Sequence, residues 1–69
     1  MSGDRRIVIR MKEDHKVVDD FIKSGEEIRI GNVRLDGSEV MIIDMKDDLH
    51  SWVSTEKFHK ITESKIEDV

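Results

Sequence analysis

The sequence has no cysteine, proline, tyrosine or alanine, and only three of its 69 residues are aromatic. Without cysteine the chain can form no disulfide, so it carries no mark of an oxidising compartment. No apolar run approaches the ~18 residues needed to cross a bilayer, and residues 1–6 lack the apolar core of a signal peptide. These absences lead us to expect a cytoplasmic protein with no membrane association.

Apolar residues make up 36% of the chain and charged residues 41%. A chain of this length should bury only about 60% of the surface that it exposes when unfolded. Sixteen of the apolar residues are Val or Ile, which favours strands because β-branched side chains pack well on a pleated surface. All five arginines precede residue 35 and most acidic residues follow it, so the first half of the chain is more basic and the second half more acidic.

The beginning of the chain predicts one strand and one helix. Residues 5–11 alternate between apolar and polar, as in a half-buried strand, and the expected inward side chains are Ile7, Ile9 and Met11. Residues 14–24 predict a helix, because Asp14 can cap its first turn and Gly25 can end it in a left-handed conformation. Its expected apolar stripe comprises Val17, Val18, Phe21 and Ile22.

Residues 26–35 predict a second strand whose alternation changes phase between Ile30 and Val33. One extra residue restores the alternation, so we expect a β-bulge at Gly31 and Asn32, where glycine tolerates the required backbone angles. The bulge would keep both halves of the strand facing the same core.

A hairpin should follow this strand. Asp36 and Gly37 both accept positive φ, which predicts a two-residue loop with Arg34 opposite Glu39. Residues 40–45 form the returning strand, and they are apolar on both faces at their start, which is typical of a central strand.

The last third of the sequence is ambiguous. Residues 49–53 predict a fourth strand, with Trp52 and His50 on one face. Ser54 could cap a helix that buries Phe58 and Ile61, or it could begin a turn that leads into a strand at residues 58–62. The second interpretation is favoured, with residues 63–69 as a polar tail that frays.

These elements predict an α+β fold in the order β-α-β-β-β, formed by residues 1–62 as a single domain. One helix packs on one face of a four-stranded, mostly antiparallel sheet. The short helical link leaves open whether the first two strands are parallel or antiparallel.

No catalytic or cofactor motif is present. The sequence has no nucleophile elbow, no Gly-rich phosphate loop and no metal-ligand spacing among His15, His50 and His59. We therefore expect a non-enzymatic protein that needs no cofactor and no metal.

The leading functional hypothesis is a protein-interaction module. A single helix covers only one sheet face, yet apolar side chains are also expected on the other face, and an uncovered apolar face implies a partner. The simplest partner is a second copy, which predicts a homodimer acting as a regulator or inhibitor that occupies a partner protein's surface. The candidate interaction residues are Trp52, His50, Met41, Ile43 and Met45.

Two alternatives use charge instead. Arginines on one sheet face could bind an anionic ligand, a nucleotide or a nucleic acid; the candidates are Arg6, Arg10 and Arg29. The overall negative charge and the scarcity of aromatic residues weigh against this alternative. In the second alternative an acidic row imitates nucleic-acid phosphates and acts as a decoy, through Asp44, Asp47 and Asp48.

Overall fold

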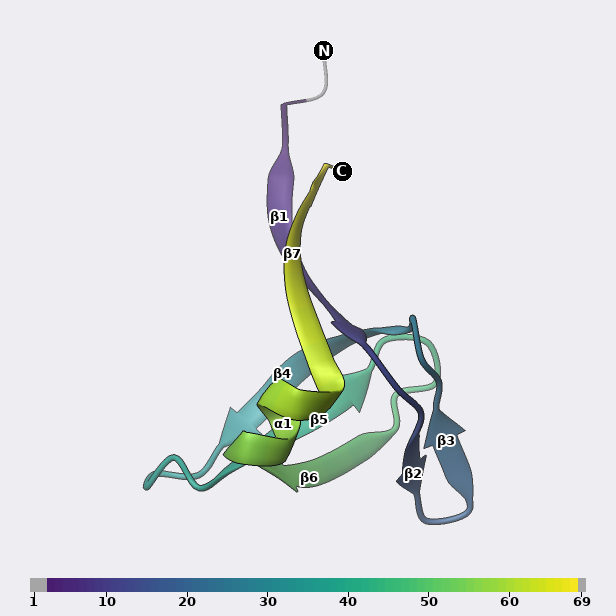
Figure 1. Ribbon diagram of the computed structural model, residues 1–69, viewed down its shortest axis with the longest axis vertical. Helices are drawn as coiled ribbons and strands as arrows, with labels where there is room; N and C mark the ends of the chain where they lie inside the picture. Colours follow the sequence, from purple (N-terminus) through teal and green to yellow (C-terminus); the bar gives the residue numbers. More distant parts are fainter. Residues whose placement is uncertain (1–2, 69) are drawn as a thin grey trace.

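The chain folds into a curved antiparallel sheet with one short helix and a small separate hairpin. The computed structural model describes residues 3–68, and Figure 1 shows its elements. The main sheet has five strands in the order β6-β5-β4-β1-β7, and neighbouring strands are antiparallel. The elements in chain order are β1 (Arg5–Met11), β2 (His15–Val17), β3 (Asp20–Ile22), β4 (Glu27–Val33), β5 (Glu39–Asp44), β6 (His50–Ser54), α1 (Thr55–Ile61) and β7 (Thr62–Asp68).

The expected α+β class, with one helix and a mostly antiparallel sheet, is confirmed at this level. The sheet has five strands in place of four, and the helix lies between β6 and β7 and not after β1. The first predicted strand is observed as β1, and it is antiparallel to β4.

The burial of β1 differs along its length. Met11 belongs to the core, as expected, and Ile9 is partly buried against the core, but Ile7 is 72% exposed. β4 pairs with β1 at Ile9 and Arg10, so Ile7 lies beyond the part of the sheet that could cover it. Its neighbour Val8 is only 1% exposed although it points to the other face of the strand.

Residues 14–24 form a β-hairpin, so the helix predicted for this segment is wrong. β2 pairs with β3 around a turn in which Val18 adopts a φ of 56°. Asp14 caps no helix; its Oδ1 accepts the Ser24 N–H at 2.8 Å and ties the two ends of the hairpin together. Val, Ile and Phe are modest helix formers but good strand formers, so local propensity does not oppose the hairpin. The hairpin buries Ile22 completely and leaves Phe21 exposed.

The predicted bulge is present in β4, for a different reason from the one expected. The β4–β5 register shifts between Ile30 and Asn32. Gly31 does not have a positive φ; what it supplies is space, because a Cβ there would lie 2.3 Å from Ile43 Cδ1. The Ile43 side chain therefore packs directly over the β4 backbone.

The β4–β5 hairpin has the predicted register with a longer loop. Val33 pairs with Val40, and the Arg34 N–H donates to the Glu39 carbonyl at 3.0 Å. The loop itself spans residues 35–38, because the Gly37 N–H closes a turn on the Arg34 carbonyl at 2.8 Å. A four-residue loop built on such a turn keeps the register of the two-residue loop.

The C-terminal segment contains both a helix and a strand, so the favoured interpretation of a turn followed by a strand at 58–62 is wrong. Ser54 caps α1, with its Oγ accepting the Lys57 N–H at 3.0 Å, and Phe58 and Ile61 are buried. Residues 63–68 do not fray as a tail, because β7 pairs with β1 from Thr62 to Asp68. Residue 69 lies outside the described part of the chain.

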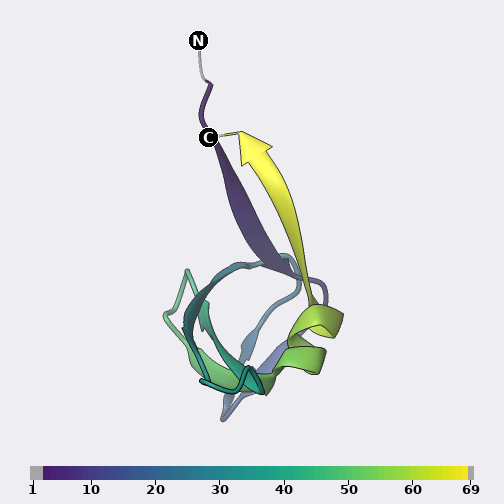
Figure 2. The same cartoon turned by 90° about the vertical axis from the view of Figure 1, so that its left-hand side faces the viewer.

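The core lies on the concave side of the sheet, between the sheet, α1 and the β2–β3 hairpin. It consists of Met11, Ile22, Ile28, Val40, Ile42, Val53, Phe58 and Ile61. Figure 2 shows the sheet curling around this core while the outer part of β1 and β7 projects away from it. The molecule is consequently elongated, with extents of 42 × 28 × 19 Å. Across residues 3–68, no helix has the length and apolar character required to span a membrane.

Candidate interaction surface

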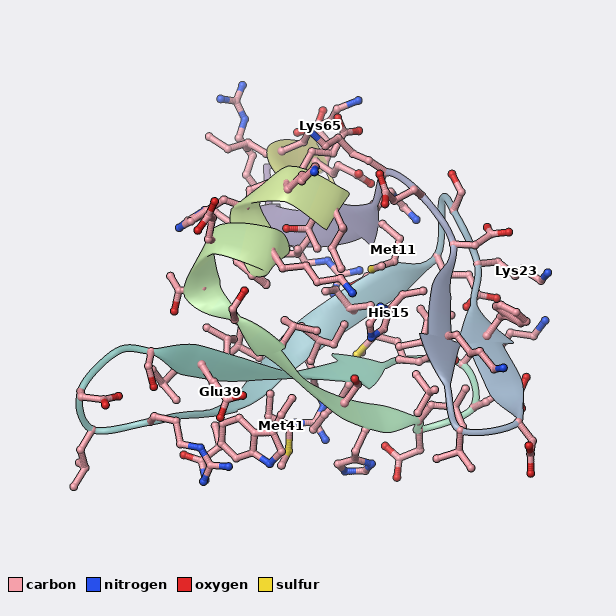
Figure 3. All side chains as sticks on the ribbon, turned by 60° about the horizontal axis from the view of Figure 1, so that its bottom comes forward. Met11, His15, Lys23, Glu39, Met41 and Lys65 are labelled. Carbon is pink, nitrogen blue, oxygen red and sulfur yellow. The ribbon has the colours of Figure 1, made fainter. Side chains whose placement is uncertain are left out.

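The five predicted interaction residues come from β5, β6 and the residue that follows β5. In the sheet, Met41 pairs with Trp52 and Ile43 pairs with His50. Met45 continues the alternation of Met41 and Ile43, and its N–H donates to the Glu27 carbonyl at 3.1 Å. These five side chains therefore share the convex face, which points away from the core. Figure 3 shows Met41 on the side of the sheet opposite α1 and Met11.

The five residues differ in accessibility. Ile43 is only 4% exposed because it packs over Gly31, so it supports the surface from beneath. Met41 and Trp52 are half-buried, whereas His50 and Met45 are exposed. The accessible part of the face consequently lies at Met41 and Trp52 and, next to the β5–β6 turn, at His50 and Met45.

Arg34 completes this surface, although sequence reasoning did not include it. Its guanidinium carbon lies 3.8 Å from the centroid of the Trp52 ring, close enough for a cation–π stack. Arg34 Nε also donates to Glu39 Oε1 at 3.1 Å, and this ion pair helps to hold the guanidinium in place. The sequence did contain a signal for Arg34. Pairing residues 40–45 with residues 49–53 places Trp52 beside Met41, and Met41 lies one diagonal step from Arg34 in the predicted hairpin.

A groove of about 540 Å³ lies beside the Trp52–Arg34 stack. It is lined by Asn32, Val33, Arg34, Leu35, Asp36, Ser38 and Trp52. Leu35 is fully exposed at the tip of the hairpin, and Val33 is 49% exposed. The groove thus combines an aromatic ring, aliphatic side chains, both signs of charge and the polar groups of a hairpin loop. We call the residues lining the groove, together with Met41, the Trp52 surface.

The predicted arginine patch is largely neutralised within the fold. Arg6 Nη2 lies 3.5 Å from Glu27 Oε1. Arg10 donates to both carboxylate oxygens of Glu67, at 3.1 and 3.2 Å, and to the Gly25 carbonyl. The hydrogen bond from Arg10 is the main reason why the pKa of Glu67 is lower than usual. Arg29 is exposed on β4 opposite Ile43, and its two predicted companions are engaged with carboxylates.

The predicted acidic row does not form as a row. Asp44 is completely buried, and its two carboxylate oxygens accept the Lys46 and Asp47 N–H groups at 3.1 Å. It therefore organises the β5–β6 turn and presents no charge to a partner. Asp47 and Asp48 remain exposed in that turn, where Asp48 has a φ of 59°.

His15 makes a contact that sequence reasoning missed. Its Nε2 lies 2.9 Å from Ser51 Oγ, joining the β2–β3 hairpin to β6. Burial, and then the positive charge of Lys57, lowers the pKa of His15. Within residues 3–68, no group of three potential ligand side chains gathers closely enough to hold a metal ion.

Comparison of the chain with protein-family models, with curated proteins and with solved structures gives no match.

Proposed function

We propose that this protein is a non-enzymatic interaction module that binds a partner protein through the Trp52 surface. The observation that supports the proposal best is the stack of Arg34 on Trp52 beside the open groove. Tryptophan and arginine are the residue types most enriched among side chains that dominate binding energy. Here the stack and the Glu39 ion pair also hold both side chains in place before a partner arrives, so little side-chain entropy is lost on binding.

The chemistry of the surface favours an apolar side chain of the partner flanked by polar contacts. The exposed part of Trp52, Met41 and Leu35 offers contact area for that side chain. Asn32, Asp36 and Ser38 offer hydrogen-bonding groups at the rim of the groove. An apolar centre with a polar rim is the usual anatomy of a protein–protein interface. Such a module acts as a regulator or an inhibitor by covering a surface that its partner otherwise uses.

The experiment compares partner capture by three variants of the immobilised chain. Trp52→Ala removes the ring, and Leu35→Ser alters a side chain that is fully exposed and so contributes little to the fold. Val18→Ser is the matched control, since Val18 is 82% exposed in the β2–β3 turn, outside the Trp52 surface.

For a protein captured by the unmodified chain, we expect Trp52→Ala to weaken the measured affinity about 30-fold, the effect of losing a dominant interface residue. Leu35→Ser should weaken it to a smaller extent and Val18→Ser should leave it unchanged. Unchanged affinity in both surface variants, each shown by circular dichroism to be folded, would contradict the proposal.

A further inference from the structure

The outer part of β1 and β7 forms a two-stranded arm. The two strands pair over their whole length, from Arg5 with Asp68 to Met11 with Thr62. β4 pairs with β1 only at Ile9 and Arg10, so within residues 3–68 the outer part of the pair has no third strand beside it. Figure 2 shows the arm projecting from the curled sheet. Two-stranded ribbons are marginally stable in water, and a further strand would stabilise this one.

One face of the arm carries an exposed apolar pair. Ile7 and Ile66 lie directly opposite each other and are 72% and 68% exposed. Their neighbours along the arm on the same face are charged at the outer end, where Arg5 Nε lies 3.5 Å from Asp68 Oδ1. β7 is also an edge strand of the main sheet, with an open side available for pairing.

The sequence of β7 is complementary to itself in one antiparallel register. Two identical antiparallel strands can be related by a two-fold axis perpendicular to the sheet. One residue of each strand then faces its own copy, because a pairing centred between two residues would place side chains from opposite faces of the sheet opposite each other. When that residue is Ile66, Lys65 of each chain faces Glu67 of the other. The apolar pairs then join into a row of four isoleucines, Ile7 and Ile66 from each copy.

The neighbouring registers are less favourable. A centre at Lys65 or at Glu67 places that charge against its own copy, which is destabilising for directly opposed strand residues. A centre at Ser64 does oppose Glu63 to Lys65, but it sets Ile66 against Thr62 and separates the isoleucines. Only the register centred on Ile66 therefore combines opposite charges across the contact with direct contact between the isoleucines.

We propose that a second copy of this chain binds at the outer edge of β7, antiparallel and centred on Ile66, to form a two-fold symmetric dimer. This inference goes beyond the proposed function, and it assigns the homodimer expected from the sequence to a surface separate from the Trp52 surface. The contact extends the two-stranded arm to four strands by backbone pairing, with the isoleucine row on one face and alternating charges on the other.

The test uses Lys65→Glu and Glu67→Lys, measured by sedimentation equilibrium at micromolar concentration. The unmodified chain should have the mass of a dimer. Each variant alone places like charges opposite each other on both sides of the central Ile66. Its association should therefore be about tenfold weaker. An equimolar mixture should recover a heterodimer, because one chain then presents two acids opposite two lysines of the other.

The variants also distinguish the proposed register from the register centred on Ser64. A register centred on Ser64 would be broken by Lys65→Glu but unaffected by Glu67→Lys, and this outcome would overturn the proposed register. Because Glu67 also binds Arg10 within the chain, a third variant, Ile66→Ser, tests the contact without changing charge and should also weaken association. The matched control, Val18→Ser, should remain dimeric.

A monomeric unmodified chain, or dimers that persist in all three arm variants, would refute the proposed contact at β7. That result would leave partner capture through Trp52 unchanged. Conversely, a failure of the Trp52→Ala experiment would leave the mass measurements unaffected, so the two proposals fail separately.

Discussion

Replacing Gly31 with alanine should destabilise the fold through one contact. The added Cβ would lie 2.3 Å from Ile43 Cδ1 and 3.0 Å from Ile43 Cγ1. Ile43 is 4% exposed, so it must change rotamer or lift away from β4. Overpacking of this kind costs about 1–3 kcal/mol. The loss of glycine's freedom in the unfolded chain offsets about 0.4–1 kcal/mol, which leaves a net loss of about 1–2 kcal/mol.

A double-mutant cycle isolates that contact. Ile43→Val removes Cδ1, the nearest atom to the added methyl group, and on its own should cost about 1 kcal/mol. In the Gly31→Ala/Ile43→Val protein the new methyl group occupies the vacated space. The double variant should therefore be about 1–2 kcal/mol more stable than the sum of the single effects predicts.

Urea unfolding followed by the fluorescence of Trp52, the only tryptophan, gives the three free energies of unfolding. Thermal unfolding should agree, because 1 kcal/mol corresponds to about 4–8 °C in Tm for a chain of this size. An unchanged denaturant slope would show that the variants alter stability and not the extent of unfolding. A Gly31→Ala protein as stable as the unmodified chain, or additive effects in the cycle, would refute the proposed close contact.

Two further predictions concern half-buried His15 and buried Asp44. Because the pKa of His15 is lowered in the folded state, its contribution to stability is present above the ordinary histidine pKa of 6.5 and is lost as pH falls through the lower folded value. Between pH ~7 and ~5 the urea midpoint should fall less in His15→Gln than in the unmodified chain. An equal fall of the midpoint in the two proteins would contradict this prediction. Asp44→Ala removes the acceptor for two turn N–H groups and should cost about 2 kcal/mol, whereas exposed Asp47→Ala should cost less than about 0.5 kcal/mol in the same unfolding assay.

Sequence could predict those parts of the fold that follow from local alternation and turn chemistry. The bulge in β4 followed from the phase change between Ile30 and Val33, and the hairpin register followed from the chemistry of Asp36 and Gly37. Alternation and turn chemistry act locally, so they can be read without knowing what each element packs against.

The failures occurred where tertiary contacts decide the structure. The stripe at residues 17–22 fits a helix, yet β2 and β3 form a hairpin whose ends are held by Asp14 and whose His15 reaches Ser51 on β6. β7 has almost no apolar alternation because both of its faces are largely exposed. Backbone pairing with β1 and the Arg10–Glu67 ion pair hold it in place, and these contacts leave no periodic pattern in the sequence.

The candidate site shows the same division. Side chains of equal parity on β5 and β6 could be assigned to one face from sequence, but not their accessibility, because the burial of Ile43 depends on its packing over Gly31. The arginine candidates were placed on exposed positions, but sequence did not reveal that β7 would supply Glu67 to neutralise Arg10. Each of these outcomes depends on a side chain or a backbone segment of another strand.

The exposed apolar side chains therefore divide into separate surfaces with different expected occupants. Ile7 and Ile66 lie on the arm, whereas Leu35 and the Trp52 groove lie at the end of the β4–β5 hairpin. Figure 1 shows the arm and this hairpin at opposite ends of the molecule. A contact centred on Ile66 consequently leaves the Trp52 surface of each chain uncovered. A dimer of the proposed form would present two such surfaces, so a partner with two sites in reach of both would bind more tightly than either surface alone allows.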